Sequence, residues 1–266
     1  MDFSLMSYRE AAASEDVAPL VFSFWEFATA REDFGTIAHE IFPDGCVSMI
    51  YHRNEKFNLR RIIFSGLNLE TVTAPVFPGD LYWGMRIAPA ACATVLRENP
   101  ANFRDLRMME GEMLPHLTGG LSEKLDVCAS FDEAVDVFES NLRNLNFETG
   151  KYDEKVARAV RAIERTAGEI KISDLSAELG LSTRQFERRF KASSGLSPKQ
   201  FARARRIRAT AVDLVENSRL SWANRAAEMG FADQAHLTHE FVSVTKRSPN
   251  SFAEKVSQIK HGKLIK

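Results

Sequence analysis

The sequence predicts an α+β protein whose first half is rich in β-strands and whose second half is entirely helical. Between residues 19 and 89, short apolar runs alternate with turn residues, a pattern typical of strands. From Asp153 onward, apolar residues recur every three or four positions, as they do on the buried face of a helix. One pattern in this helical region occurs twice. We therefore expect a β-rich domain over 1–145, a linker over 146–152 and an all-helical domain over 153–260.

The clearest strand patterns of the first half cover residues 21–27, 46–51, 60–64 and 81–87. Such strands predict a small β-barrel or sandwich, which either encloses a small ligand or is filled by its own side chains. Residues 89–97 and 101–109 look helical. Ser130, followed three positions later by Glu133, is a capping box that opens a further helix. These helices are expected to form a layer that covers the barrel or pairs two subunits.

The helical half contains a stretch, residues 174–198, that predicts two short helices meeting at a tight turn around Gly180. Leu175 and Leu179 form one apolar i,i+4 pair before the turn, and Phe186 and Phe190 form another after it. The second helix has a defined start, because Ser182 occupies an N-cap position and Gln185 completes a capping box. The pattern is that of a helix-turn-helix.

The same pattern returns about 50 residues later. Residues 177–181 (AELGL) recur as 227–231 (AEMGF), and past the turn the apolar positions recur with an offset of 51. The second turn is therefore one residue longer, and Asp233 is its expected N-cap. Pro198 suits the first turn of a long helix that reaches about Glu216 and joins the two units.

The charge of the chain is divided between its halves. The whole chain carries 35 Lys and Arg against 36 Asp and Glu, a net charge of −1. From Lys151 onward, 23 basic residues face 13 acidic ones, whereas the first 150 residues hold 12 basic and 23 acidic ones. An acidic front half and a basic back half fit a regulatory domain joined to a module that binds a polyanion.

Cysteine content and hydropathy set further expectations. The three cysteines, Cys46, Cys92 and Cys128, are far apart in sequence, which indicates neither a disulfide framework nor a zinc knuckle and favours a reducing compartment. The sequence shows no secretory signal pattern and no apolar run of about 18 residues. We expect a soluble cytoplasmic protein with no membrane partner and no cofactor.

Residues 153–256 resemble the DNA-binding domain of the AraC/XylS family. The segments ELGLSTRQFERRFKASSGLSPKQF and AAEMGFADQAHLTHEFVSVTKRSPNSF stand very close to the two signature segments of that family. The resemblance implies a bacterial-type transcription regulator, not an enzyme, whose partners are double-stranded DNA and the transcription machinery. Residues 19–145 resemble a cupin-like sensor region found in front of some such regulators, which implies control by a small-molecule effector or by a homodimer and assigns no effector-binding residue.

The outward positions of the two second helices are the expected base-reading residues. With Phe186 and Phe190 turned inward, a basic stripe faces solvent, and a guanidinium there can bond O6 and N7 of guanine together. Glu187 could accept from a cytosine amino group or hold a neighbouring arginine. The expected base-reading residues are Arg184, Glu187, Arg188, Gln234, His236, Thr238 and His239. The expected phosphate contacts are Lys191, Lys199, Arg206, Lys246 and Arg247. Family members usually carry arginine where His239 stands, so sequence reading should be concentrated in the first unit.

Other interpretations use the same residues differently. The basic stripe could be an ordinary solvated face. His236 and His239 could hold a metal, but no third ligand is evident. His39 and His52 match no metal motif either, and the aromatic residues of the strands, which could line a ligand pocket, are more often plain core. Two other functions stay open: a metal-dependent cupin-like enzyme, and a DNA-repair methyl acceptor, which the absence of a cysteine cluster argues against. No catalytic or metal-binding residue is assigned.

Overall fold

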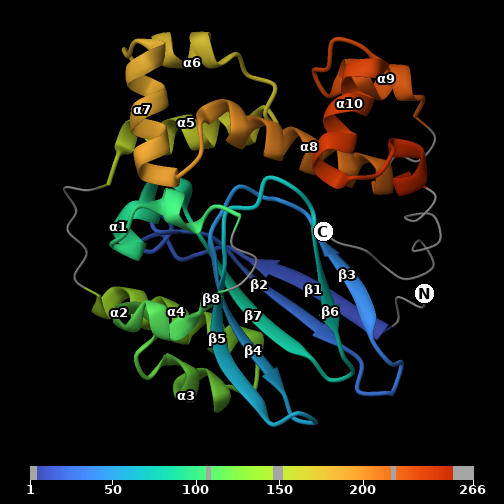
Figure 1. Ribbon diagram of the computed structural model, residues 1–266. Coiled ribbons are helices and arrows are strands. Elements are labelled where there is room, and N and C mark those ends of the chain that lie inside the picture. The colour runs from blue at the N-terminus through green and yellow to red at the C-terminus, as the bar shows by residue number, and fades with distance from the viewer. Residues whose placement is uncertain (1–4, 106–108, 146–151, 217–219, 254–266) are drawn as a thin grey trace.

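The protein is described by a computed structural model, which covers residues 5–105, 109–145, 152–216 and 220–253. Its first part, up to residue 145, contains the strands and a helical layer, and its second part, from residue 152, is helical. The helical part lies across one end of the strands, with α8 running along the boundary between the two parts (Figure 1). This arrangement confirms the predicted α+β class.

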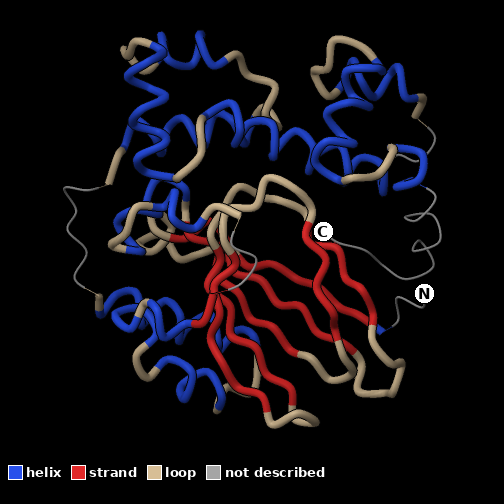
Figure 2. Tube along the Cα trace, viewed as in Figure 1, coloured by secondary structure: helices blue, strands red, loops and turns tan. Residues whose placement is uncertain are grey.

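The strands of the first part form two sheets. The strands are β1 Met6–Ala11, β2 Val21–Thr29, β3 Ile37–Ile41, β4 Ser48–Asn54, β5 Leu59–Ser65, β6 Val72–Val76, β7 Leu81–Ile87 and β8 Met109–Glu110. Six of them make an antiparallel sheet in the order β1-β2-β7-β4-β5-β8, and β3 pairs with β6 in a second sheet. The expected barrel is therefore divided into two sheets that face each other (Figure 2), with an apolar cluster that includes Phe27, Ile37 and Val76 between them.

The four predicted strands are confirmed, 81–87 at the predicted bounds and the other three with shifted ends, and β1, β3, β6 and β8 were missed. β1 is an edge strand whose side chains are largely polar and exposed, and β6 contains Pro75, which argues against a strand on propensity. The predicted helix over 101–109 is wrong. A 3-10 turn ends at Phe103, Asp105 takes a positive φ of 57°, and Met109 pairs with Phe64.

The remaining helical elements of the first part are short except for the last. They are η2 Pro89–Ala91, α1 Cys92–Leu96, η3 Pro100–Phe103, η4 Gly111–Met113, α2 Pro115–Thr118, α3 Leu121–Asp126 and α4 Phe131–Asn144. Ser130 caps α4 as predicted, because its side chain accepts a hydrogen bond from the Glu133 amide. Phe138 and Leu142 of α4 pack into the core against one face of the six-stranded sheet. The helical layer thus covers this sheet.

The second part contains both predicted helix-turn-helix units. Its helices are α5 Glu154–Arg165, α6 Ile172–Glu178, α7 Thr183–Ser194, α8 Pro198–Glu216, α9 Trp222–Glu228 and α10 Gln234–Thr245. Gly180 and Gly230 take the same left-handed conformation in the two turns, with φ of 64° and 66°. Asp233 caps α10 as expected. The predicted inward residues of both units are buried, including Phe186, Phe190, Leu237 and Phe241.

The second part has two hydrophobic cores, and α8 contributes to both. Phe201 belongs to the core of the first unit, whereas Ile207 and Leu214 belong to that of the second. The 19 residues of α8 span about 28 Å at 1.5 Å per residue. The two units therefore have separate cores on one long helix.

The first unit is joined to the sheets by an apolar contact. Leu196, which follows α7, belongs to the core of the sheet part, and Ala90 of η2 belongs to the core of the first unit. Tyr152 contacts both cores. Most of the expected linker, residues 146–151, lies outside the described residues, as does the end of the expected domain beyond residue 253.

Gly195 tests this contact. Its φ is 81°, and an added Cβ would lie 2.5 Å from Leu67 Cδ1 and 2.8 Å from the Pro100 carbonyl carbon. Gly35 is a matched control, because its φ is 75° and nothing lies within 4 Å of an added Cβ. We expect Gly195→Ala to lower the free energy of unfolding by about 1 to 3 kcal/mol more than Gly35→Ala, as measured by urea denaturation. Equal losses would show that the two parts do not pack in this way.

Candidate nucleic-acid interface

Helix α7 is fixed at both ends and along its inner face. Ser182 Oγ accepts from the Gln185 amide at 3.3 Å, and Gln185 Oε1 accepts from the Ser182 amide at 3.0 Å, which completes the predicted capping box. Gly195 ends the helix in a left-handed conformation. Arg189 Nε reaches back to Asp153 Oδ2 at 2.7 Å, so α7 is also tied to the start of α5.

The outer face of α7 is open to solvent. Arg184, Glu187, Arg188 and Lys191 are all exposed, as the spacing predicts. Within the described ranges, no hydrogen bond or ion pair is recorded for these four side chains, so Glu187 does not hold a neighbouring arginine here. The helix therefore presents a basic row with unengaged guanidinium groups on a rigid support.

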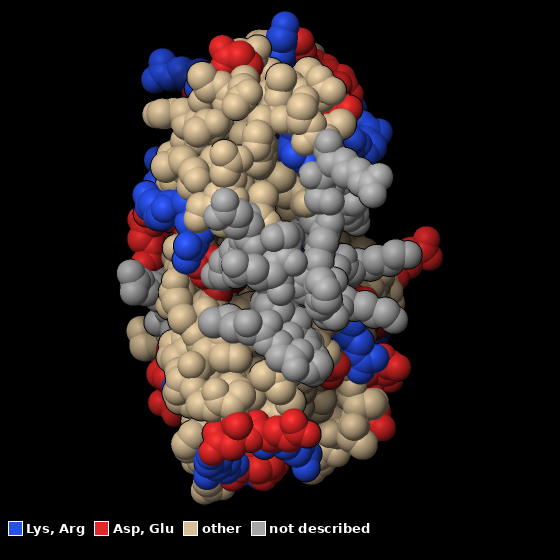
Figure 3. All heavy atoms as spheres, turned by 90° about the vertical axis from the view of Figure 1, so that its right-hand side faces the viewer, with Lys and Arg blue, Asp and Glu red and all other residues tan. Residues whose placement is uncertain are grey.

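The matching face of α10 has a different character. Gln234, Ala235 and His239 are exposed, and they line a shallow groove with Thr238, Val242 and Ser243. Figure 3 turns the side that carries the second unit toward the viewer, and much of its helical surface is uncharged. The second unit thus offers hydrogen-bonding groups but little positive charge on this face of α10.

Two predicted base-reading residues of α10, His236 and Thr238, form hydrogen bonds within the second unit. The Ala232 amide donates to His236 Nδ1 at 3.2 Å, and the His236 ring lies edge-on to Phe231. Thr238 Oγ1 donates to the Gln234 carbonyl at 2.8 Å. His236 therefore helps to close the turn, and Gln234 and His239 are the side chains of α10 best placed to reach outward.

The predicted phosphate contacts fall into three groups. Lys191 and Lys199 are exposed, and no partner is recorded for them among the described residues. Arg206 instead donates to the Gly168 and Gly230 carbonyls, each at 3.2 Å, and lies over the Phe231 ring. This placement gives Arg206 a bridging role between the two units rather than a free guanidinium for a phosphate.

Lys246 and Arg247 form the third group, and both pair with the sheet part. Lys246 Nζ lies 2.6 Å from Glu70 Oε1, and Arg247 Nη2 lies 2.5 Å from Glu40 Oε1. Between them, the Thr71 amide donates to the Val244 carbonyl at 2.9 Å. Neither ion pair could be predicted from the sequence, because a single carboxylate on a strand or loop gives no signal of a distant partner.

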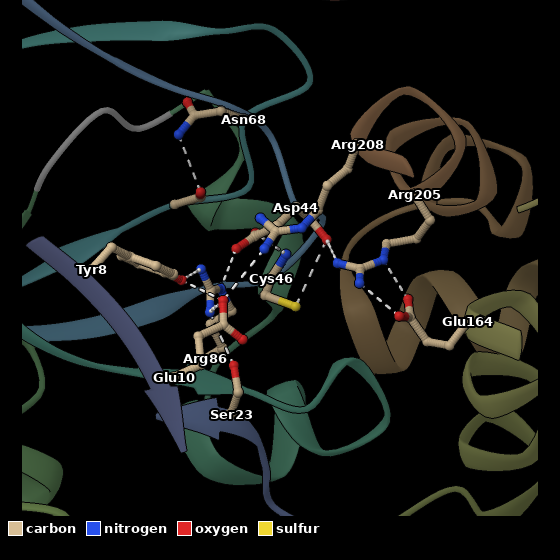
Figure 4. Close-up of polar contacts among 11 residues, drawn as sticks. Tyr8, Glu10, Ser23, Asp44, Cys46, Asn68, Arg86, Glu164, Arg205 and Arg208 are labelled. Atoms are coloured by element: carbon tan, nitrogen blue, oxygen red, sulfur yellow. Dashed lines mark hydrogen bonds and ion pairs between the residues drawn. The ribbon is translucent and has the colours of Figure 1, made fainter. Parts of the chain in front are cut away.

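A partly buried polar cluster joins the sheets to α8 (Figure 4). Arg86 Nε contacts Asp44 Oδ2 at 2.5 Å, and its Nη1 contacts Glu10 at 3.0 Å. Arg205 donates to the Asp44 carbonyl, and Arg208 pairs with Glu10. Burial alone would raise the pKa of Asp44, but the charge of Arg86 and then that of Arg208 outweigh it and lower the pKa. Asp44 is therefore an ionised carboxylate within the contact.

Comparisons with known proteins agree with these helices. Residues 175–255 match the model of a family described as a helix-turn-helix domain. The chain carries an AraC-type DNA-binding domain. In this part the chain resembles the AraC-type transcriptional regulators, a family of non-enzymes. Residues 9–109 match a domain of unknown function (DUF6597).

Three solved structures illustrate the likeness. An AraC-type regulator from Chromobacterium violaceum is 24% identical, with 40% of this chain and 94% of that chain covered and a TM-score of 0.36. The DNA-binding domain of AdpA in complex with a target DNA is 26% identical, with 40% and 96% covered and a TM-score of 0.36. ToxT from Vibrio cholerae is 14% identical, with 96% and 99% covered and a TM-score of 0.41. No curated protein sequence matches the chain. Because all three TM-scores are below 0.5, the assignment rests on the family match and on the helices themselves.

The structure also bears on the two pairs of histidines considered above as metal ligands. In the described part of the chain, no three His, Cys, Asp or Glu side chains are arranged to hold a metal ion. His52 Nε2 is hydrogen-bonded to Asp80 Oδ1, and the His39 ring stacks on Phe27.

No helix within the described ranges is long and apolar enough to cross a lipid bilayer.

The three cysteines are all buried. Burial is the largest cause that raises the pKa of Cys46 and of Cys128, and it alone raises the pKa of Cys92. Each thiol is therefore kept protonated at neutral pH, which is the opposite of what a methyl-accepting or redox-sensing cysteine requires.

The thiols provide a direct measurement. At pH 8, we expect iodoacetamide to alkylate the native protein more than about tenfold more slowly than the urea-unfolded protein, because the thiolate is the reacting species. Mass spectrometry of cysteine peptides would follow each site. Rapid alkylation of Cys46 in the native protein would contradict its burial.

Proposed function

We propose that this AraC-type regulator binds a specific duplex DNA sequence with α7 in one major groove and α10 in the next groove along the same face. The single observation that carries the proposal is the exposed, unengaged basic row on α7, a helix whose ends and inner face are fixed. The length of α8, about 28 Å, is close to the 34 Å of one DNA turn, which suits two units on one face.

The two units contribute unequally to the proposed recognition of the DNA sequence. Arg184 and Arg188 are four residues apart on the outer face of α7 and are the candidates for bidentate contacts with guanine. Gln234 suits adenine by its amide, whereas His239 is shorter and more weakly donating than the arginine usual in the family. The first unit therefore supplies most of the sequence reading, and the second mainly fixes the register.

Phosphate contacts would add affinity without reading sequence. Lys191 and Lys199 are exposed and positioned on or next to the reading helices. Lys246 and Arg247, at the end of α10, are the corresponding cations of the second unit. Each cation that meets a phosphate releases counterions, so binding should weaken steeply as salt rises.

We further infer that the sheet part restrains the second unit. Glu70 and Glu40 hold the same two cations, Lys246 and Arg247, that would otherwise meet DNA phosphates. The first unit is held by buried apolar contact, which salt does not screen. The second unit is held by the exposed Lys246–Glu70 pair, by the Arg247–Glu40 pair, whose carboxylate is 15% exposed, and by Phe42, which packs against its core. We place the release at the second unit, because a change of charge or salt acts on its ion pairs. A ligand or a second copy of the chain would control DNA binding by changing this restraint.

Arg188→Ala tests direct reading. Loss of a bidentate contact should weaken binding to the selected site by about 1 to 3 kcal/mol and relax the preference at one base position. Binding-site selection from random duplexes followed by fluorescence anisotropy would measure both effects. Arg158→Ala, at an exposed arginine of α5, is the control and should change neither. An equal loss of affinity on every sequence would mean that Arg188 contacts phosphate only.

Glu40→Gln combined with Glu70→Gln tests the restraint. Exposed ion pairs contribute about 0 to 1 kcal/mol each, so the double variant should bind DNA about two- to tenfold more tightly at low salt. The matched control, Glu55→Gln with Glu123→Gln, removes the same charge from exposed positions that do not contact α10. If both double variants gained affinity equally, general charge rather than the restraint would be the cause.

A further inference from the structure

A small cavity opens at the seam between the two sheets, on the face of the six-stranded sheet that the helical layer leaves uncovered. Its volume is about 340 Å³. It lies near the β4–β5 and β6–β7 turns, at the ends of the strands away from the helical part (Figure 1). Its lining residues are His52, Phe57, Leu59, Arg61, Pro75, Phe77, Asp80 and Tyr82.

Three of these side chains form a row across the sheet. His52 on β4 is the register partner of Tyr82 on β7 and of Arg61 on β5, so all three point to the same face. The His52 ring stacks on Tyr82, with centroids 4.1 Å apart and planes inclined by 14°. The imidazole is therefore held in one orientation, with its edge toward the cavity.

Asp80 fixes the proton of this imidazole. Its carboxylate accepts from His52 Nε2 at 3.0 Å, Asn54 Nδ2 at 2.7 Å, the Phe77 amide at 2.8 Å and the Tyr82 hydroxyl at 3.1 Å. Burial alone would raise the pKa of Asp80, but the hydrogen bonds from His52, Phe77 and Asn54 lower it. With an ionised partner at Nε2, a neutral His52 carries its proton there and leaves Nδ1 as an acceptor.

Two buried polar atoms at the cavity have no hydrogen-bond partner among the described residues. They are His52 Nδ1 and Arg61 Nε, and the His52 side chain is only 7% exposed. Arg61 Nη1 contacts Glu110 at 3.2 Å, which leaves its Nε side toward the cavity. Buried polar atoms are rarely left without a hydrogen bond. The two atoms therefore indicate a ligand that donates to His52 Nδ1 and accepts from Arg61 Nε.

The rest of the wall is apolar and largely aromatic. Phe57 and Phe77 meet edge to face, with centroids 5.3 Å apart. Phe57 lies at the mouth of the cavity and is 52% exposed. The combination of an apolar wall with a few convergent polar groups is typical of a small-molecule site, and the volume is at the small end of the usual range.

We propose that this seam cavity binds a small molecule with a flat apolar body, an acidic group that accepts from Arg61, and a hydroxyl or N–H that donates to His52 Nδ1. A single guanidinium matches a single carboxylate, and the cavity volume suits one ring rather than a nucleotide. This ligand would regulate DNA binding through the restraint on the second unit proposed above. Its regulatory role rests on that restraint, whereas its binding to the cavity does not.

The test uses the full-length protein without DNA. Para-hydroxybenzoate, para-hydroxyphenylacetate and para-hydroxyphenylpropionate place an acid at increasing distance from a phenol, and calorimetric titration would measure each. We expect saturable binding of at least one, with a weaker response to its carboxamide and to the analogue that lacks the phenol. The absence of saturable binding for all three acids would overturn the proposal.

Adjacent arginines supply a matched pair of variants. Arg61→Gln should weaken binding of the best acid at least tenfold. Arg60→Gln should leave it unchanged, because Arg60 lies on the opposite face and contacts Asp126 and Glu55. Equal binding to wild-type protein and to Arg61→Gln would overturn the assignment of the acidic group.

Footprinting the same preparations separates this proposal from the DNA-binding one. Wild-type protein that footprints duplex DNA but binds no acid would contradict only the cavity proposal. Protein that binds an acid through Arg61 but footprints no DNA would contradict only the proposed DNA reading.

Discussion

The bridge that Arg206 makes between two backbone carbonyls fixes the relation of the two DNA-reading units. Its guanidinium donates to Gly168, at the end of the first helix of one unit, and to Gly230, in the turn of the other. A planar guanidinium with several donors suits such a double contact better than any other side chain. Because both acceptors are backbone atoms, the bridge sets the position of the chain itself, and the separation of α7 and α10 along α8 depends on it.

The other arginines of α8 also act in support. Arg203 contacts Ser243 of α10, Arg205 pairs with Glu164 of α5, and Arg208 pairs with Glu10 of β1. A helix crowded with arginines in a DNA-binding domain invites an assignment to phosphates, yet these side chains hold the helices and the sheets together. The cations proposed to face DNA are therefore those of α7 and the few beside the two proposed reading helices, which explains how a basic domain can still have a largely uncharged face on α10.

The features predicted correctly from the sequence are those that depend on residues close to each other in the chain. The caps at Ser182 and Asp233, the glycine turns and the inward apolar residues depend on neighbours within a few positions, so both helix-turn-helix units could be located in advance. The short strands β3 and β6 could not be located in advance, because it is their pairing with each other, rather than the strand propensity of their residues, that stabilises them. Likewise, the roles of Glu40, Glu70 and Arg61 depend on partners far away in the chain, and no spacing rule encodes such contacts.

The two-stranded sheet connects the seam cavity to the second reading unit. Pro75 and Phe77, in and just after β6, line the cavity, whereas Glu70 and Thr71, just before β6, contact the end of α10. Glu40 lies on β3, paired opposite Thr73. A ligand that bridges Arg61 to the β6 side of the cavity would bind differently when this sheet is closer to or farther from the six-stranded sheet. Only such a difference in affinity could shift the proposed restraint on α10, so the small sheet is the element through which the two proposed sites would be coupled.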